Sequence, residues 1–362
     1  MRIAAVAPPW LPVPPVAYGG TELVLDNLCR GLAAAGHDVL LCTTGDSTCP
    51  VERAWTYERH LGVANVSPAT ELHHAIDAHD TAAEWGADVV HDHTIGGPVW
   101  AQLHSRVPVV TTNHGPFAPP LDVIYRRLAR HLPVVAISHH QASTANDIPI
   151  ARVIHHGIDL SQVAVGDGAG GYALFLGRMN PDKGIDAAID IARRAGLPLR
   201  IAAKMQEPAE LAYFRECIEP RLGAGVEYVG EVGGAVKQAL LRDAVCLLNP
   251  ISWAEPFGMV MIEALACGTP VVSTPLGAAP EIVEHGVSGF LGRSVDELGA
   301  LVGRAAGLRR DACRRRVERA FSMARMAADH VELYDSLVAR SHAAEAELTA
   351  HLSVTADLVV TR

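Results

Sequence analysis

The sequence lacks a long apolar run, an excess of basic charge and a signal-peptide pattern, and each absence excludes a class of protein. No apolar stretch approaches the roughly 20 residues that a membrane-spanning helix needs. The net charge of −10 argues against a nucleic-acid partner, because such proteins usually carry a basic face. Residues 1–7 begin directly as a strand pattern, without a basic region and a longer apolar core. We therefore expect a cytoplasmic protein.

Cysteine and histidine are both present, but their spacing predicts neither disulfides nor a metal centre. The seven cysteines are scattered without a CxxC pair, and several fall in strand or helix patterns, as is typical of buried thiols in a reducing cytosol. The 18 histidines include HDH at 91–93, HH at 139–140 and HH at 155–156. These groups do not make a convincing set of metal ligands, so we expect no zinc and no metal cofactor.

The chain has alternating strand and helix patterns, and it is long enough for two α/β domains. Its 362 residues, 49% hydrophobic and 19% charged, suit a globular protein of two ordinary domains. RIAAVAP predicts a strand, and Gly19-Gly20 follows after a proline-rich loop. Thr21 can cap the next helix, which ends at Gly36 before the strand HDVLLCTT. This order is the opening βαβ unit of a doubly wound sheet.

The alternation continues to about residue 160 and then restarts, which predicts the domain boundaries. The stretch 161–171, SQVAVGDGAGG, is rich in glycine and typical of a linker. We therefore predict an N-terminal Rossmann-like domain over 1–160 and a C-terminal one over 172–325. Residues 326–362 are predicted as a C-terminal helix and a tail. Because the strands are short, apolar and β-branched, both sheets should be parallel and covered on both faces.

Polar residues follow the strands of the first predicted sheet, at the edge where ligands bind in open α/β sheets. They are His91, His93, Asn113, His114, Gly115, Ser138 and His139. Each histidine alone is more typical of a surface or capping position, but together they indicate a cleft. In the second half, Arg178 and Lys183 flank a loop before a helix, where two cations would add charge to a bound diphosphate; a solvated loop is the alternative.

The most informative stretch is EPFGMVMIE, from Glu255 to Glu263, which follows an apolar strand pattern. The proline after Glu255 keeps that residue in the loop, so the helix should begin near Gly258. Phe257, Gly258 and Met259 then offer N–H groups without helical partners, a natural seat for a phosphate. Carboxylates accept hydrogen bonds from sugar hydroxyls, so the stretch predicts a nucleotide-sugar site. Two glutamates at this spacing also occur by chance in many helices, but the position after a strand favours ligand binding.

These motifs resemble those of the retaining glycosyltransferases of family 4, the glycosyl transferases of group 1, which have the GT-B architecture. The match covers nearly the whole chain and includes Gly19-Gly20, NHG at 113–115, GRMNPDKG at 177–184 and GEV at 230–232. The most specific part is SWAEPFGMVMIEALACGTPVVSTPLGAAPEIVEHGVSGFL, which holds the two glutamates of the family signature. The resemblance implies an α/β fold of two Rossmann-like, doubly wound domains that face a cleft, with the last helix returning to the first domain.

The resemblance also implies a role for each matching residue in binding a nucleotide diphosphate sugar as the donor. Arg178 and Lys183 would bind the diphosphate, Glu255 the sugar hydroxyls and Glu263 the ribose diol. The main chain of Val232 would contact the base. The other implied site residues are Gly19 and Gly20 beside the phosphates, His114 near the anomeric carbon, and the N–H groups of Phe257, Gly258 and Met259. The implied catalytic set is His114, Arg178, Lys183 and Glu255. His156 stands where the family often has asparagine, and it receives no role.

The implied activity is transfer of a hexosyl-type sugar to an acceptor hydroxyl, with retention of configuration and without a metal. Two other functions stay open: a sugar-nucleotide epimerase, which needs no acceptor, and a nucleotide-sugar-binding protein without turnover. The acceptor could be a saccharide, a lipid or a natural product. Arg126, Arg127 and Arg130 lie beside apolar residues on a predicted helix and allow a weak peripheral membrane contact; a solvated face is the alternative.

Overall fold

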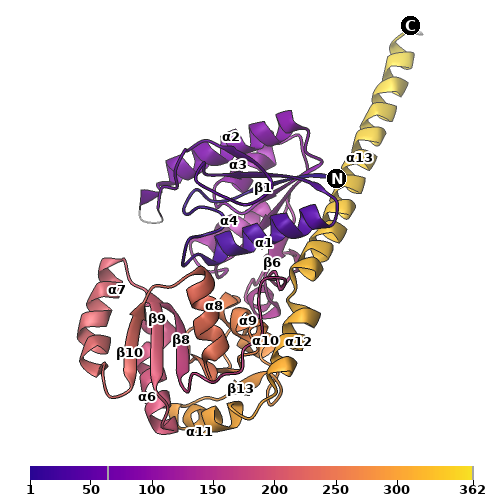
Figure 1. Cartoon of the computed structure of the whole chain (residues 1–362). Coiled ribbons are helices and arrows are strands. Elements are labelled where there is room, and N and C mark those ends of the chain that lie inside the picture. The colour runs from indigo at the N-terminus through magenta and orange to yellow at the C-terminus, as the bar shows by residue number, and fades with distance from the viewer. Residues whose placement is uncertain (63–64, 361–362) are drawn as a thin grey trace.

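The computed structural model describes residues 1–62 and 65–360, and it contains two parallel sheets with helices packed on both sides (Figure 1). The first sheet has seven strands and the second has six. The chain forms one sheet completely before it begins the other, so the two sheets belong to two domains. The predicted α/β architecture of two doubly wound domains is confirmed. Among the described residues, no helix combines the length and the apolar character that crossing a membrane requires.

The N-terminal sheet has the strand order β3-β2-β1-β4-β5-β6-β7. Its strands are β1 (Arg2–Val6), β2 (Asp38–Thr43), β3 (Glu52–Trp55), β4 (Val89–Asp92), β5 (Val109–Thr112), β6 (Val134–Ala136) and β7 (Ile150–Val153). Its helices are α1 (Gly20–Ala34), α2 (Pro68–Trp85), α3 (Gly97–His104), α4 (Leu121–Leu128) and α5 (His139–Ser143). The central strands β4 and β5 are buried along their whole length because helices cover both faces of the sheet.

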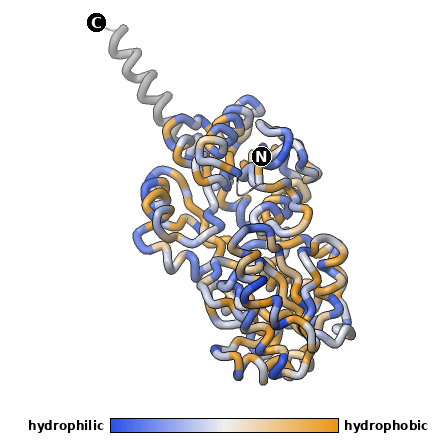
Figure 2. The backbone as a smooth tube through the Cα atoms, turned by 90° about the vertical axis from the view of Figure 1, so that its left-hand side faces the viewer, coloured by the Kyte–Doolittle hydropathy of each residue, from blue (hydrophilic) through white to orange (hydrophobic). Residues whose placement is uncertain are grey.

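The C-terminal sheet has the strand order β10-β9-β8-β11-β12-β13. Its strands are β8 (Ala173–Arg178), β9 (Leu199–Lys204), β10 (Val226–Gly230), β11 (Cys246–Asn249), β12 (Val271–Ser273) and β13 (Gly289–Leu291). Its longer helices are α6 (Ile185–Ala195), α7 (Pro208–Tyr213), α8 (Gly234–Asp243), α9 (Met259–Ala266), α10 (Ala279–Ile282), α11 (Val295–Ala305) and α12 (Arg310–Ala320). Short helical turns lie at η2 (Pro181–Lys183), η3 (Phe214–Ile218) and η4 (Glu219–Arg221). In Figure 2, apolar and hydrophilic segments alternate along the chain in both lobes.

The last helix, α13 (Met323–Val360), returns to the N-terminal domain and packs along α1 (Figure 1). Met326, Tyr334 and Leu337 of α13 lie in the same apolar core as residues of β1 and α1. The return begins where the chain crosses itself: Ile158 donates to the Phe321 carbonyl at 3.0 Å, and Met323 donates to Ile158 at 2.9 Å. A Cβ on Gly157 would clash with the backbone of Ser322, so this crossing needs glycine.

Three local features differ from the sequence analysis or add to it. Thr21 does not cap its helix, because α1 begins at Gly20 and Gly19 occupies the capping position. The predicted linker at 161–171 lies between β7 and β8, and three of its N–H groups bond to the C-terminal domain, including Gly166 to the Cys267 carbonyl at 3.0 Å. The predicted C-terminal helix, α13, begins at Met323, and a separate helix, α12, ends just before it at Ala320. The exact domain boundaries stay a prediction.

Candidate active site

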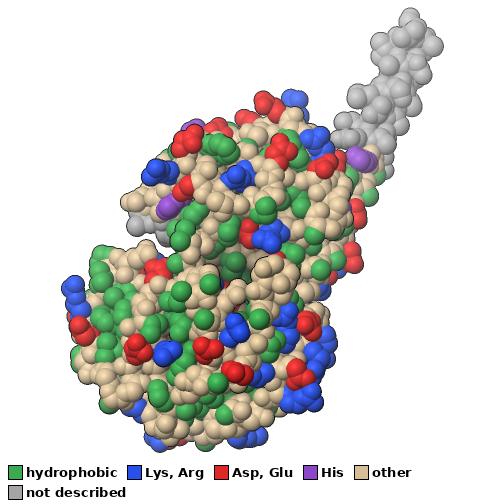
Figure 3. Space-filling model, viewed as in Figure 1, with side chains coloured by type: hydrophobic (Ala, Val, Ile, Leu, Met, Phe, Trp, Pro, Cys, Tyr) green, Lys and Arg blue, Asp and Glu red, His purple; other side chains and the backbone are tan. Residues whose placement is uncertain are grey.

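A cleft lies between the two domains, lined by the loops that follow β1, β5, β8 and β11 (Figure 3). All the residues to which the resemblance assigns a role line it: Gly19, Gly20, His114, Arg178, Lys183, Val232, Glu255, Phe257, Gly258, Met259 and Glu263. Of the polar residues that follow the strands of the first sheet, His114 lines this cleft, whereas His91, His93, Asn113, Gly115, Ser138 and His139 do not. The residues with an assigned role come from segments up to about 240 positions apart, and each was predicted from its local motif. The structure brings them together because both parallel sheets turn the carboxyl ends of their strands toward the same space.

The EPFG turn places one glutamate in the loop and the other on the helix, as the sequence predicts. Glu255 precedes α9, which begins at Met259, and Glu263 lies one turn into this helix. Gly258 has a φ of 96°, a left-handed conformation that glycine adopts without strain. The backbone of Glu255 is held by the loop between β12 and α10, because the N–H of Ala278 donates to the Glu255 carbonyl at 3.0 Å. The free N–H groups at the start of α9 therefore lie beside a carboxylate held in a fixed position.

Each signature glutamate is paired with a lysine in the cleft. Lys183 Nζ lies 2.5 Å from Glu255 Oε1, and Lys237 Nζ lies 2.5 Å from Glu263 Oε1. The Lys183–Glu255 pair is largely buried, with 10% and 15% of the two side chains exposed. The other carboxylate oxygen of Glu255 is buried and has no hydrogen-bond partner among the described residues. A buried oxygen without a hydrogen bond destabilises the protein, so this oxygen is suited to accept a hydrogen bond from a ligand hydroxyl.

Several cleft residues were not identified from the sequence. Lys237 lies on α8, 26 residues before its partner Glu263, and nothing in its local pattern marks it. Lys204 ends β9, and Asn249 ends β11, where a polar residue after a buried strand could have been noticed. The ring of Trp253 lies 5.2 Å from the Lys183 ammonium, a cation–π contact beside the Lys183–Glu255 pair. These residues add two cations and an aromatic face to the predicted site.

His114 belongs to a series of five neighbouring histidine rings, of which His114 and His156 line the cleft. The ring centroids are 5.1 Å apart for His330 and His91, 3.9 Å for His91 and His93, 5.1 Å for His93 and His114, and 5.3 Å for His114 and His156. Burial, together with the charge that His330 could carry, lowers the pKa of His114 to about 4. His114 is therefore a neutral imidazole at physiological pH, able to donate or accept a hydrogen bond but not to act as a cationic acid.

The neighbour His93 determines which nitrogen of His114 carries the proton. His93 Nδ1 lies 2.8 Å from His114 Nε2, while His93 Nε2 is buried without a partner among the described residues. Burial lowers the pKa of His93 well below its usual value, so both rings are neutral. An orphaned buried N–H is rarer than an orphaned acceptor, which places the His93 proton on Nδ1. His93 then donates to Nε2 of His114 and leaves His114 with its proton on Nδ1, as the donor it can offer in the cleft.

This arrangement gives a prediction about tautomers. In ¹⁵N–¹H correlation spectra of the ligand-free protein, His114 should carry its proton on Nδ1, and His93→Leu should give a mixture of tautomers because the donor is lost. The buried pair of His79 Nε2 and Asp92, 2.8 Å apart, serves as an internal control whose signals should not change. A His114 ring protonated on Nε2 in the unmodified protein would contradict the assignment.

Glu22, at the start of α1, is a second buried titratable group beside the cleft. It is 2% exposed, and a Cβ on Gly19 would lie 3.0 Å from its Oε2. Burial raises its pKa to about 7, although a backbone hydrogen bond acts in the opposite direction. The folded state therefore holds this proton up to a higher pH than the unfolded chain does.

We expect stability to depend on pH through Glu22. Because its folded pKa is raised, its contribution is complete below the unfolded pKa of 4.5 and is lost as pH rises through about 7. Glu22→Gln should therefore gain about 3 kcal/mol in free energy of unfolding relative to the unmodified protein at pH 8, and little at pH 4.5. Urea unfolding of both proteins at the two pH values measures this difference. An equal effect at both values would show that Glu22 does not titrate in this range.

Two family models match the chain, and together they cover both domains. The model described as Glycosyltransferase Family 4 matches residues 18–162, and the model described as Glycosyl transferases group 1 matches residues 170–308. The division between the two models falls at the glycine-rich stretch that lies between the sheets. The signature glutamates lie in the second match, and Gly19, Gly20 and His114 lie in the first.

Named relatives and solved structures agree with the family models. The chain is 28% identical to a glycogen synthase of Mycobacterium tuberculosis, covering 80% of this chain and 81% of the relative. It is 26% identical to a phosphatidyl-myo-inositol mannosyltransferase of Mycobacterium leprae, covering 87% and 90%. AviGT4, a glycosyltransferase involved in avilamycin A biosynthesis, matches with a TM-score of 0.70 and 28% identity over 93% of this chain and 98% of that one. Anabaena HepE, solved in complex with UDP and glucose, matches at 0.73 and 20% identity over 93% and 100%, which shows the shared fold.

Proposed function

Because the chain belongs to the glycosyl transferases of group 1, we propose that it moves a hexosyl-type sugar from a nucleotide diphosphate sugar to an acceptor hydroxyl, with retention of configuration. The observation that carries the proposal is the pair of lysine–glutamate contacts, Lys183–Glu255 and Lys237–Glu263, on one wall of the cleft. Two carboxylates suit two polyols, and the cations with the start of α9 between them suit a diphosphate. The complex of HepE with UDP and glucose supports a donor of this class.

The donor would lie along α9, with its sugar beside Glu255 in the preceding loop and its ribose beside Glu263 on the helix. Glu255 would accept hydrogen bonds from sugar hydroxyls through its unpartnered oxygen, and Glu263 would accept from the ribose diol. The N–H groups of Phe257, Gly258 and Met259 would bind phosphate oxygens or the sugar. Val232 would contact the base through its main chain, and Gly19 and Gly20 would let the first domain approach the phosphates closely.

Catalysis would depend on charge at the leaving group. As the bond from sugar to phosphate breaks, the phosphate oxygen gains negative charge and the sugar gains oxocarbenium character. Arg178 and Lys183 would stabilise the leaving oxygen, which removes the need for a metal ion at this step. Lys183 can do so because it already lies in the cleft, held by Glu255 and Trp253. No metal or other cofactor is part of this proposal.

Retention would follow from attack on the face that the phosphate leaves. The acceptor oxygen would bond to the anomeric carbon while its proton passes to the departing phosphate oxygen on the same side. His114 would donate its Nδ1–H to the sugar near the anomeric carbon and so hold it for attack. As a neutral ring with a pKa of about 4, it would keep this role across the physiological pH range.

The acceptor would enter from the N-terminal domain, and a lipid acceptor would require membrane contact. Arg127 and Arg130 are exposed near α4, whereas Arg126 pairs with Asp122 at 3.3 Å. Tyr125 and Leu128 of α4 are buried in the domain and Val123 is exposed, so these arginines would have to bind anionic lipid mainly by charge. Flotation with anionic liposomes should then be abolished by charge reversal at the three arginines, and no flotation of the unmodified protein would end the idea.

A thermal-shift screen with EDTA tests the donor class. UDP, GDP, ADP and dTDP, and their common sugars, are added separately to the purified protein, and one nucleotide family should raise the midpoint. Glu263→Ala should reduce that shift. A product linked to an acceptor establishes transfer; an epimerised donor sugar formed without acceptor would replace the proposal with an epimerase. Tight binding without any turnover would indicate a binding protein.

A further inference from the structure

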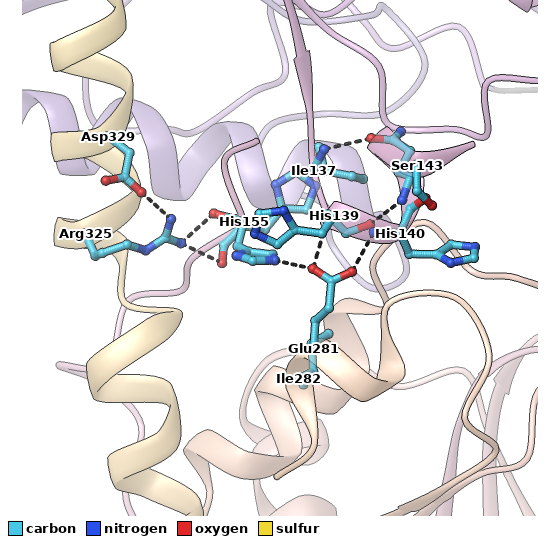
Figure 4. A network of polar contacts seen from close by, with 12 residues as sticks. Ile137, His139, His140, Ser143, His155, Glu281, Ile282, Arg325 and Asp329 are labelled. Carbon is cyan, nitrogen blue, oxygen red and sulfur yellow. Dashed lines mark hydrogen bonds and ion pairs between the residues drawn. The ribbon is translucent and has the colours of Figure 1, made fainter. Parts of the chain in front are cut away.

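Outside the cleft, Glu281 of the C-terminal domain meets two histidines of the N-terminal half (Figure 4). Glu281 lies on α10, His139 begins α5, and His155 follows β7. One candidate ligand atom from each residue lies within 4.8 Å of the other two. The sequence analysis found no metal set among the histidine doublets, because the third ligand lies 126 residues beyond His155.

We infer that His139, His155 and Glu281 bind a zinc-like divalent transition-metal ion that joins the two domains. Two imidazole nitrogens and one carboxylate oxygen are a ligand set that zinc takes in proteins, with a fourth position left for water. Magnesium and calcium prefer oxygen ligands only, so the two histidines select against them. These three residues do not line the donor cleft, so the ion would not touch the leaving group.

The carboxylate is already oriented and ionised for this role. Its Oε1 accepts from the N–H of His140 at 2.7 Å, and its Oε2 accepts from the N–H of His139 at 2.8 Å and from His155 Nε2 at 2.7 Å. Burial alone would raise the pKa of Glu281, but these hydrogen bonds outweigh it and lower the pKa. A carboxylate has about four lone-pair positions, so at least one stays available to an ion.

The His155 ring is also held in place. Its centroid lies 5.6 Å from that of Phe321 and 6.0 Å from that of Phe257, and it makes an edge contact with His139 at 5.4 Å. Its main-chain carbonyl accepts from Arg325, which is anchored by Asp329 (Figure 4). His139 is exposed and gives solvent access, so an ion can enter and leave. Packing on one side and an opening on the other are what a reversible site requires.

Ion binding has to compete with a proton. His155 Nε2 and Glu281 Oε2 now share one hydrogen bond, and the ion would take the place of that hydrogen, which is released or moves to Nδ1. Because the ligands come from both domains, the bound ion should also raise the thermal midpoint.

Calorimetric titration of zinc into the chelator-treated, full-length protein at pH 7.5 tests the site, with the thermal midpoint as a second readout. We expect one ion per chain and a rise in the midpoint, with His139→Asn lowering the affinity at least about tenfold. His140→Asn is the matched control, because that ring is adjacent but points away from the carboxylate (Figure 4) and should leave binding unchanged.

Two further measurements make the result decisive. Glu281→Gln should also weaken binding, and circular dichroism shows whether that variant is folded; His139→Asn, at an exposed position, tests the site independently of it. Cobalt should give the visible absorption of a tetrahedral site in the unmodified protein and in His140→Asn only. No zinc binding, or equal binding by His139→Asn and His140→Asn, would overturn the inference. Neither outcome bears on sugar transfer, which is measured separately.

Discussion

Replacing Arg178 and Lys183 together by glutamine is expected to lower kcat by at least about a thousandfold, while donor affinity falls much less. Removing a single donor that stabilises a developing anion typically lowers kcat by roughly 10²–10³. Both residues line the cleft beside the start of α9, and the charge on the leaving oxygen is greatest in the transition state. Glutamine is preferred to alanine at Lys183, because it can still donate to Glu255 and keeps that largely buried carboxylate paired.

Lys204→Gln is the control for this experiment. Lys204 lines the same cleft, but its ammonium is bound by Glu207 at 3.0 Å and Glu210 at 3.4 Å. Single-turnover kinetics and nucleotide titration separate the chemical step from binding for both variants. If kcat of the double variant is within about tenfold of that of the unmodified enzyme, Arg178 and Lys183 do not stabilise the leaving group.

Glu263→Ala is expected to weaken binding of the nucleotide by about 1.5–3 kcal/mol, the range for hydrogen bonds to a charged group. That energy corresponds to a roughly 10- to 150-fold higher dissociation constant. The ribose diol would lose its acceptor, and Lys237 would lose the carboxylate that lies 2.5 Å from its ammonium. Turnover at saturating donor should change less than affinity, since the ribose is bound alike in the ground state and the transition state.

A double-mutant cycle with Lys237→Gln separates the two effects. If Glu263 binds the ribose directly, Glu263→Ala lowers the nucleotide affinity both in the protein with Lys237 and in the Lys237→Gln variant. If its only role is to hold Lys237, the loss disappears once Lys237 is replaced. Unchanged nucleotide affinity in a folded Glu263→Ala protein would contradict the ribose assignment.

The sequence alone predicted the architecture and most strands of the two sheets. Buried parallel strands are rich in apolar residues, and this shows in runs such as VVA in β6. The strands β3, β7 and β13 were missed, and all three lie at the edges of their sheets. In β3 the residues ERAW also carry two charges. The start of α9 was predicted correctly, since proline and glycine restrict the backbone locally. The sequence was therefore sufficient to predict those strands and helix starts that depend on the residues of the segment itself.

Only the tertiary structure decided which residues face one another. Lys237 pairs with Glu263, and His93 orients His114, through space rather than along the chain. The same holds for the proposed metal site: His139 and His155, one from each of two doublets, lie beside Glu281 only because the two domains pack together. A sequence motif identifies residues whose conformation or role depends on their neighbours along the chain. A residue that contacts the site only through space has no such motif, because its contact depends on how the two sheets and α13 pack together.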